Sequence, residues 1–261
     1  MVKKLEQLIR KSGALRPPLS LLYGDPGVGK STCAARARDA LVMRTEDGLG
    51  LIEVDTLPLV ETYPQAIEWI NALIESESTD HRTLVIDSVD GLEELCAIDL
   101  CQRHGKDSLA DFQWGKGFAY LSDAWIDLLR RLQALRDRHS MQIILIAHAA
   151  RVTVESLTDG SFERYEPNLH KRITPLVTKW ADLIGFLEME RTTKTVQGSR
   201  RDTKTSVTTG QRILHVEDNG SFIAKNRFGF PSEIPIGIMD GWGVVESHLS
   251  ARKNSNNKEA A

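Results

Sequence analysis

The sequence has few cysteines, no long apolar run and no excess of positive charge, and each absence excludes a class of protein. Its three cysteines, Cys33, Cys96 and Cys101, are odd in number and lack a second ligand pair, which excludes a disulfide scaffold and a paired-cysteine zinc site. We expect them to be buried thiols. No apolar run approaches the ~18 residues of a membrane span. The formal charge of −3 excludes a globally basic nucleic-acid binder, so any contact with DNA requires local cationic patches or an assembly that concentrates them.

The length of 261 residues suits one α/β domain with a small appendage, and the sequence contains no internal repeat. The first residues, MVKKLEQLIRK, form a charged amphipathic segment and do not resemble a signal peptide. We therefore expect a basic helical segment over 1–15, one domain over 16–249 and a disordered polar tail over 250–261. We also expect a cytoplasmic protein without a membrane partner.

The most informative segment is GDPGVGKS, Gly24–Ser31, which fits the pattern GxxxxGK[ST] and follows the apolar run Leu19–Tyr23. This pattern predicts a strand, a glycine-rich turn and a helix start whose backbone N–H groups hold the phosphates of a nucleotide. We expect Lys30 to pair with these phosphates and the Ser31 hydroxyl to ligate Mg²⁺, so the predicted cofactors are ATP and Mg²⁺. The predicted nucleotide-binding residues are Gly24, Asp25, Pro26, Gly27, Val28, Gly29, Lys30, Ser31 and Thr32.

Strand and helix patterns alternate along the chain in βαβ order. Strands are expected at 19–23, 41–44, 51–54, 83–87, 141–147 and 181–189. Helices are expected at 32–40, 65–76, 91–104, 118–138 and 169–178. The run 141–147 is continuously apolar, as a parallel strand buried on both faces should be. Residues 151–168 are polar and predict a loop, and 212–216 and 221–224 predict antiparallel edge strands.

Two acidic positions are candidates for the chemistry that a phosphate loop alone cannot supply. Asp87 ends the apolar strand TLVID, which places its carboxylate toward the Mg²⁺; its alternative role is a cap of the following helix. Glu46 in MRTEDGLG is the candidate that orients the attacking water, with Asp47 as its substitute. A solvated turn residue is the alternative for both.

His148 follows the apolar strand 141–147, at the edge where α/β sheets bind ligands. It is a candidate catalytic residue that senses the γ-phosphate and relays its presence to the next segment. A histidine that merely caps the strand is the competing interpretation.

Eight segments, read in order, resemble the RecA-like single-strand annealing ATPases of bacteriophages. They are GDPGVGKS, MRTEDGLG, TLVIDSVDGLEEL, FQWGKGF, IILIAHA, RYEPNL, WADLIGF and FIAKNRFGFP, between about residues 16 and 236. The resemblance implies a RecA-like P-loop NTPase fold: a three-layer αβα sandwich with a mainly parallel central sheet and antiparallel edge strands. It also places the catalytic glutamate of RecA on Glu46. At His148 the chain fits the phage group better than RecA itself, which has a glutamine-bearing loop there.

The segment AKNRFGFP resembles the KxR hairpin of ring-shaped replicative helicases, in which a lysine and an arginine reach the nucleotide of the neighbouring subunit. The matching residues are Lys225 and Arg227. The resemblance therefore implies catalysis in trans within a homo-oligomer, either a ring or a short filament. Without it, two basic residues on an edge strand would be interpreted as a solvated face.

In RecA-like proteins two loops line the assembly axis and hold DNA, and they correspond here to residues 105–118 and 150–168. Both combine cations with aromatics, as single-strand binding requires. They hold Lys106, Phe112, Trp114 and Lys116, and Arg151, Phe162, Arg164 and Tyr165. Anchoring onto the core is the alternative for Trp114 and Tyr165. The basic stretch 191–204, with Arg191, Lys194, Arg200, Arg201 and Lys204, is a further candidate, or a solvated hairpin.

These features together predict a Mg²⁺-dependent ATPase that binds single-stranded DNA and promotes strand annealing in phage recombination. The resemblance implies a bacterial host cell and a single-strand-binding protein as partner. One alternative is a ring-shaped, helicase-like DNA motor. Another is a binding module in which ATP only gates DNA affinity. A small-molecule kinase is disfavoured, because the sequence has no lid motif.

Overall fold

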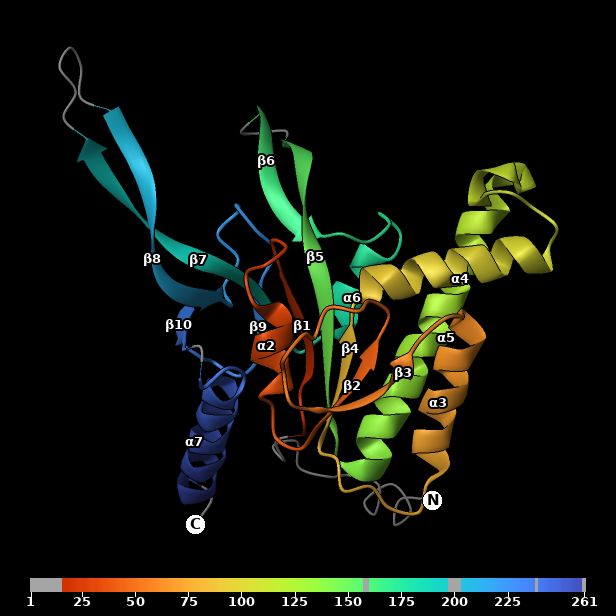
Figure 1. Ribbon diagram of the computed structural model, residues 1–261, viewed down its shortest axis with the longest axis horizontal. Coiled ribbons are helices and arrows are strands. Elements are labelled where there is room, and N and C mark those ends of the chain that lie inside the picture. The colour runs from red at the N-terminus through yellow and green to blue at the C-terminus, as the bar shows by residue number, and fades with distance from the viewer. Residues whose placement is uncertain (1–15, 157–159, 197–202, 238, 260–261) are drawn as a thin grey trace, which may run out of the picture.

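The computed structural model describes residues 16–156, 160–196, 203–237 and 239–259 (Figure 1). The helix expected over 1–15 lies outside the described residues. The central sheet has the strand order β10-β8-β7-β1-β5-β4-β2-β3. Its parallel core consists of β1 (Leu19–Gly24), β2 (Ala40–Arg44), β3 (Asp55–Leu59), β4 (Thr83–Asp87), β5 (Gln142–Ser156) and β7 (Leu183–Val196). Antiparallel partners are β6 (Gly160–Pro167), β8 (Thr203–His215), β9 (Lys225–Asn226) and β10 (Glu233–Ile236).

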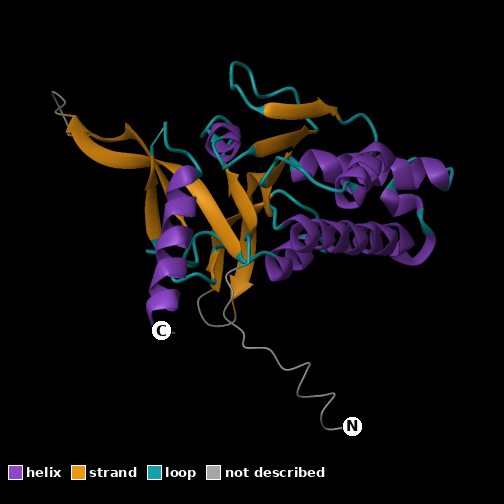
Figure 2. Cartoon of the chain, turned by 90° about the horizontal axis from the view of Figure 1, so that it is seen from below, coloured by secondary structure: helices purple, strands orange, loops and turns teal. Residues whose placement is uncertain are grey.

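Helices cover both faces of this sheet, as the view from below shows (Figure 2). One face packs against α3 (Tyr63–Glu75), α4 (Val89–Arg103), α5 (Lys116–His139) and α6 (Thr174–Trp180). The other packs against α2 (Lys30–Ala35) and α7 (Gly243–Glu259). The predicted three-layer sandwich, with its mainly parallel sheet and antiparallel edge, is confirmed.

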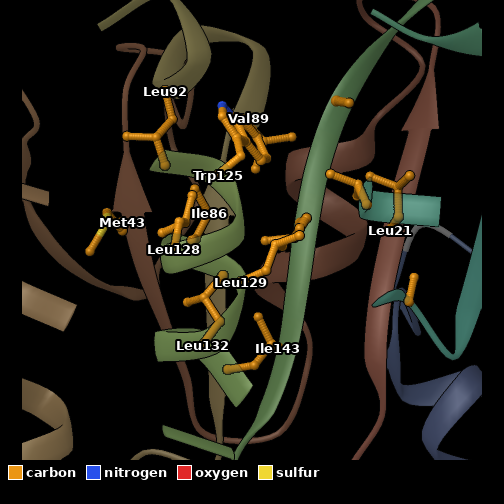
Figure 3. Close-up of a cluster of buried hydrophobic side chains, with 14 of the residues drawn as sticks. Leu21, Met43, Ile86, Val89, Leu92, Trp125, Leu128, Leu129, Leu132 and Ile143 are labelled. Carbon is orange, nitrogen blue, oxygen red and sulfur yellow. The ribbon is translucent and has the colours of Figure 1, made fainter. Parts of the chain in front are cut away.

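The larger core cluster forms where α5 lies against the sheet (Figure 3). Trp125, Leu128 and Leu132, spaced three and four residues apart, are fully buried against strand residues such as Ile86 and Ile143. Each such side chain contributes about 1.5 to 3 kcal/mol by leaving water. The helical spacing of these residues in the sequence predicted this buried face. The packing holds α5 against the sheet whose strands carry the site.

Strand β5 lies between β1 and β4, although its sequence comes after both. Gly24 is therefore in register with His148 on one side of β5, and Asp87 with Ile146 on the other. Because these strands are parallel, their carboxyl ends meet at one edge of the sheet. The topology thus brings the phosphate loop, Asp87 and His148 together.

The expectation of a loop over 151–168 is wrong. Strand β5 continues to Ser156 and pairs antiparallel with β6, from Ala149 opposite Pro167 to Ser156 opposite Gly160. Several residues of this hairpin are polar and exposed, so its sequence lacks the apolar signal of a buried strand. The hairpin projects from the same end of the sheet as the β7–β8 hairpin (Figure 1).

Further expectations differ from the structure, among them the helices expected over 32–40 and 169–178, which span Lys30–Ala35 and Thr174–Trp180. The strand predicted at 51–54 occurs instead at 55–59, where mostly exposed residues and Pro58 are tolerated because β3 is the edge strand. Residues 221–224 form one isolated bridge, Tyr165 with Phe222, in place of a strand. From Ser250 the chain continues α7 as far as Glu259, so the predicted disordered tail is wrong over that range: the helix is already established by buried Val245 and Leu249.

Candidate nucleotide-binding site

The phosphate loop connects β1 to α2 and depends on glycine at three positions. A Cβ on Gly24 would lie 2.3 Å from the Leu187 carbonyl oxygen, so only glycine allows β1 to approach β7 so closely. Gly27 and Gly29 have φ of 76° and 97°, in the left-handed region that other residues rarely adopt. These positions let the backbone curl so that its N–H groups can converge on an anion.

Lys30 is buried inside this loop. Its ammonium donates to the carbonyl oxygens of Gly24 and Asp25, both at 3.0 Å. Burial lowers the pKa of Lys30, while the carboxylates of Asp87, Asp90 and Glu46 act in the opposite direction. The ammonium is thus held in the loop by weak neutral partners, which the phosphates of a nucleotide can replace.

Asp87 lies at the end of β4, facing the start of α2. Burial raises the pKa of its carboxyl group, and a hydrogen bond from the Ser31 hydroxyl opposes that shift. A hydroxyl and a carboxylate in contact, beside a phosphate loop, are oxygen ligands of the kind that Mg²⁺ prefers. The two predicted metal-binding residues are therefore adjacent, and their oxygens would suit a Mg²⁺ ion.

Glu46 and Asp47 point in different directions. Glu46 lines the cavity at the phosphate loop, where its carboxylate accepts a hydrogen bond from the Ser88 hydroxyl. Asp47 is 87% exposed and pairs with Arg44 at 3.2 Å. Thr45 fixes this segment, because its hydroxyl donates to the Ser88 carbonyl oxygen and accepts from the Ser88 N–H, both at 2.9 Å. Of the two candidates, Glu46 faces the phosphate cavity and Asp47 faces solvent.

His148 is held by Asp90, in the first turn of α4. Its Nδ1 lies 2.6 Å from Asp90 Oδ2, its backbone N–H donates to Asp90 Oδ1 at 3.3 Å, and its Nδ1 is 3.9 Å from Glu46 Oε1. The donor atoms of Glu46, Asp90 and His148 lie within 4.8 Å of one another, so this group could also hold a divalent cation. His148 thus connects the candidate water-orienting residue to α4.

Two cavities meet at Glu46 and His148. A cavity of about 300 Å³ is lined by the phosphate loop, Asp87, Glu46 and His148. A second cavity, of about 710 Å³, lies on the other side of Glu46 and His148 and is lined by carboxylates of α4, including Asp90 and Glu93. Glu46 and His148 therefore form a wall that both cavities share.

Lys225 and Arg227 lie away from this site within the chain. Lys225 pairs with Ile184, near the amino-terminal end of β7, whereas the phosphate loop adjoins Leu187. The Lys225 ammonium donates to carbonyl oxygens at the end of α6, those of Thr178 at 2.8 Å and Ala181 at 2.6 Å. It therefore caps that helix, a favourable position for a cation.

Arg227 follows β9 and pairs with Asp182 at 2.9 Å, with 56% of its side chain exposed. Neither Arg227 nor Lys225 reaches the phosphate cavity of its own chain.

The first candidate DNA loop, 105–118, contains a buried aromatic, Phe112, an exposed one, Trp114, and the half-buried Phe118. Phe112 is buried, with its ring 5.3 Å from that of His104 and 5.8 Å from that of Tyr120. Trp114 is 93% exposed, in a left-handed conformation with φ 59°. Lys106 and Lys116 are exposed as well. Phe112 thus anchors the loop, and Trp114 presents a flat apolar face to solvent.

In the second candidate, the β5–β6 hairpin, the cations have partners within the chain. Arg151 donates to the Tyr165 hydroxyl at 2.8 and 3.1 Å, and the Tyr165 ring stacks on Phe186 with centroids 5.1 Å apart. Arg164 pairs with Glu166 at 2.6 Å. Tyr165 is therefore an anchor, while Phe162 is half-buried.

Of the third candidate, 191–204, residues 191–196 lie in β7 and 203–204 in β8, where the two strands pair, and 197–202 lie outside the described residues. Arg191 is exposed, and the side chains of Lys194, Arg200, Arg201 and Lys204 lie outside the described residues.

Residues that the sequence did not single out complete the site. Ser88 and Asp90 hold Glu46 and His148, and Arg212 of β8 donates to the phosphate loop. Ser88 had a recognisable signal, because a serine that precedes a helix commonly caps it, and here it accepts from the Gly91 N–H. Arg212 had none, because its partner is 184 residues earlier in the chain.

A phosphate loop after β1 and a carboxylate at the end of β4, in a parallel sheet between two helix layers, define a P-loop nucleotide-binding protein. A family model described as AAA domain matches residues 16–228, so the chain belongs to the AAA domain family. No curated protein matches the chain.

Similar solved structures include the RadB recombinase, with a TM-score of 0.47 and 14% identity over 89% of this chain and 92% of that one. The flagellar accessory protein FlaH from Methanocaldococcus jannaschii has a TM-score of 0.40 and 10% identity, covering 89% of each chain. Within the described residues, no helix combines the length and apolar character that a membrane span needs.

Proposed function

We propose that the chain is a Mg²⁺-dependent ATPase that binds single-stranded DNA and promotes strand annealing in phage homologous recombination. The observation that carries the enzymatic part is the single cavity at which Lys30, Ser31, Asp87, Glu46 and His148 converge. The AAA domain match over most of the chain supports nucleotide binding at this cavity.

Each of these residues has a defined task in phosphoryl transfer to water. Mg²⁺ neutralises phosphate charge when bound, and Ser31 and Asp87 would hold it or its water ligands. Lys30 offers its ammonium to the phosphate oxygens, and the loop N–H groups supply fixed dipoles. Glu46, held by Ser88, accepts a proton from or orients the attacking water. His148 lies beside Glu46, where it can respond to the γ-phosphate.

Hydrolysis is tested by measuring phosphate release from Mg-ATP by the parent and by Lys30→Ala. We expect Lys30→Ala to lose turnover and keep its circular dichroism spectrum, because only the charge contact is removed. Lys179→Ala is the matched control, since Lys179 is an exposed lysine on α6. Parental turnover in folded Lys30→Ala would refute the ATPase proposal.

The exposed ring of Trp114, in a segment that also carries the exposed Lys106 and Lys116, supports the proposal of single-strand binding. A chain of net charge −3 can hold DNA only through local cations, so affinity should fall steeply with salt. Annealing of complementary strands, measured with ATP and with a non-hydrolysable analogue, separates a turnover-coupled machine from an ATP-gated binding module. Displacement of a strand from a forked duplex would favour the helicase-like motor.

We also propose that a single-strand-binding protein is the partner on DNA. The proposed active form is a homo-oligomer in which Arg227 and Lys225 complete the cavity of a neighbouring protomer. Arg227 is the stronger candidate, because one exposed ion pair holds it while Lys225 already donates to several carbonyl groups. Turnover should then rise more than linearly with protein concentration. A mixture of Arg227→Ala and Lys30→Ala should regain activity, and strictly linear activity without rescue would refute the role in trans.

A further inference from the structure

Arg212 joins the β7–β8 hairpin to the phosphate loop. It lies on β8, opposite Met189 of β7, and β7 is the strand next to β1. From there its Nε donates to the Val28 carbonyl oxygen at 2.6 Å. The distance is that of a strong, charge-assisted hydrogen bond. A half-buried arginine therefore reaches the backbone of the phosphate loop from β8, which is separated from β1 by β7.

The guanidinium occupies the space behind Gly29. A Cβ at Gly29 would lie 2.8 Å from Arg212 Nε and 3.3 Å from its Cζ and Nη2. Among the residues that the structure describes, no carboxylate forms an ion pair with Arg212. Its positive charge thus lies directly against the phosphate loop without an ion-pair partner among the described residues.

The hydrogen bond to Val28 fixes the direction of one loop amide. The Val28–Gly29 peptide is trans, since the cis bond in the described chain is at Asp87–Ser88. In a trans peptide the C=O and the following N–H point in opposite directions. Because the Val28 carbonyl points at Arg212, the Gly29 N–H points away from it, and Gly29 lines the phosphate cavity.

We propose that Arg212 is a positioning residue for nucleotide polyphosphates: it holds the Val28–Gly29 peptide so that the Gly29 N–H is aimed at the bound phosphates, and it adds charge behind them. This inference rests on the proposed nucleotide-binding function. The effect of Arg212 should fall on nucleoside diphosphates and triphosphates, because a phosphate loop holds the β-phosphate that a monophosphate lacks.

Calorimetric binding of Mg-ADP and of AMP to the parent and to variants tests the role. We expect Arg212→Met to weaken ADP binding about tenfold or more, with AMP binding changed less than twofold. Arg212→Gln should keep much of the ADP affinity, because its neutral amide can still donate to Val28. Gln211→Ala, at the exposed neighbour on β8, is the matched control and should bind ADP as the parent does.

Three outcomes would each overturn the positioning role. Arg212→Met could bind ADP with the parental affinity, or it could lose as much affinity for AMP as for ADP. Alternatively, Arg212→Gln could bind ADP as weakly as Arg212→Met does. Melting temperatures verify that the variants fold, and Arg212→Ala provides the same comparison should Arg212→Met not fold. A parent protein that binds neither ADP nor ATP refutes the proposed function itself, which distinguishes the two failures.

Discussion

Replacing Glu93 by glutamine should remove a pH dependence of stability that the fold creates on α4. Both carboxylate oxygens of Glu93 accept from the His170 N–H, at 3.0 and 3.1 Å, beside the larger cavity. Burial raises the pKa of Glu93 from 4.5 to about 7; the hydrogen bond from His170 opposes this shift, and the charge of Asp90 adds to it. Between these two pH values the folded protein retains a proton that the unfolded chain has released.

The free energy of unfolding should therefore fall as pH rises from about 4.5 to about 7, and Glu93 should add no further loss above that. The difference between the two pKa values corresponds to at most about 3 kcal/mol. Because the side chain is partly exposed, we expect about 1 to 2 kcal/mol.

Urea unfolding at pH 5 and pH 8 measures this contribution directly. Glu93→Gln keeps an oxygen that accepts from His170 and carries no charge, so its stability should decline less between the two pH values than that of the parent. Glu94→Gln, at the exposed neighbour, is the control and should follow the parent. If Glu93→Gln and the parent lose the same stability between pH 5 and pH 8, the reasoning from burial is wrong.

Three other changes separate the roles of neighbouring residues. Glu46→Gln should bind ATP at parental affinity and lose at least about 100-fold in turnover, since the amide cannot take up a proton. Asp47→Asn should turn over ATP at the parental rate. The reverse pattern in steady-state rates would exchange the two roles. Trp114→Ala should weaken single-strand binding about 5- to 100-fold, measured by fluorescence anisotropy, without changing the melting temperature. Phe112→Ala should lower the melting temperature, because it removes a buried ring. Unchanged DNA affinity in Trp114→Ala would show that this ring does not bind DNA. Lys225→Ala should lower the free energy of unfolding, measured with urea, by about 0.5 to 2 kcal/mol, because the end of α6 loses its cap. An unchanged urea midpoint of unfolding would contradict the capping role.

The parts of the fold that the sequence predicted well are those with a local signal. The strand at 83–87 was predicted with its correct bounds, because an apolar run ends at a carboxylate. The apolar side chains of α5, at helical spacing, gave its buried face. The glycines and Lys30 of the phosphate loop were recognisable because their conformation and chemistry require those residue types at that spacing.

The parts that the sequence missed depend on contacts between distant segments. The β5–β6 hairpin has exposed polar residues such as Arg151 and Glu163, so its strands exist through pairing and not through burial. The contact of Arg212 with the phosphate loop could not be predicted from its neighbours in the sequence, because it depends on the pairing of β8 with β7. The same holds for Asp90, whose partner His148 is 58 residues away. The trans role of Lys225 and Arg227 stays a prediction, because it concerns a second protomer.

Strand β5 runs without interruption from Gln142 to Ser156, from the buried centre of the sheet into the projecting hairpin. His148 lies within it, next to the phosphate cavity, and the eight residues beyond it span roughly 26 Å at the usual rise of a strand. The pairing of β5 changes at His148, from parallel with β1 to antiparallel with β6, so a tilt of the outer part by about 5° at that point would displace Ser156 by roughly 2 Å. One strand therefore connects the phosphate cavity to the outer part of the hairpin, and a small shift at His148 corresponds to a larger displacement at Ser156.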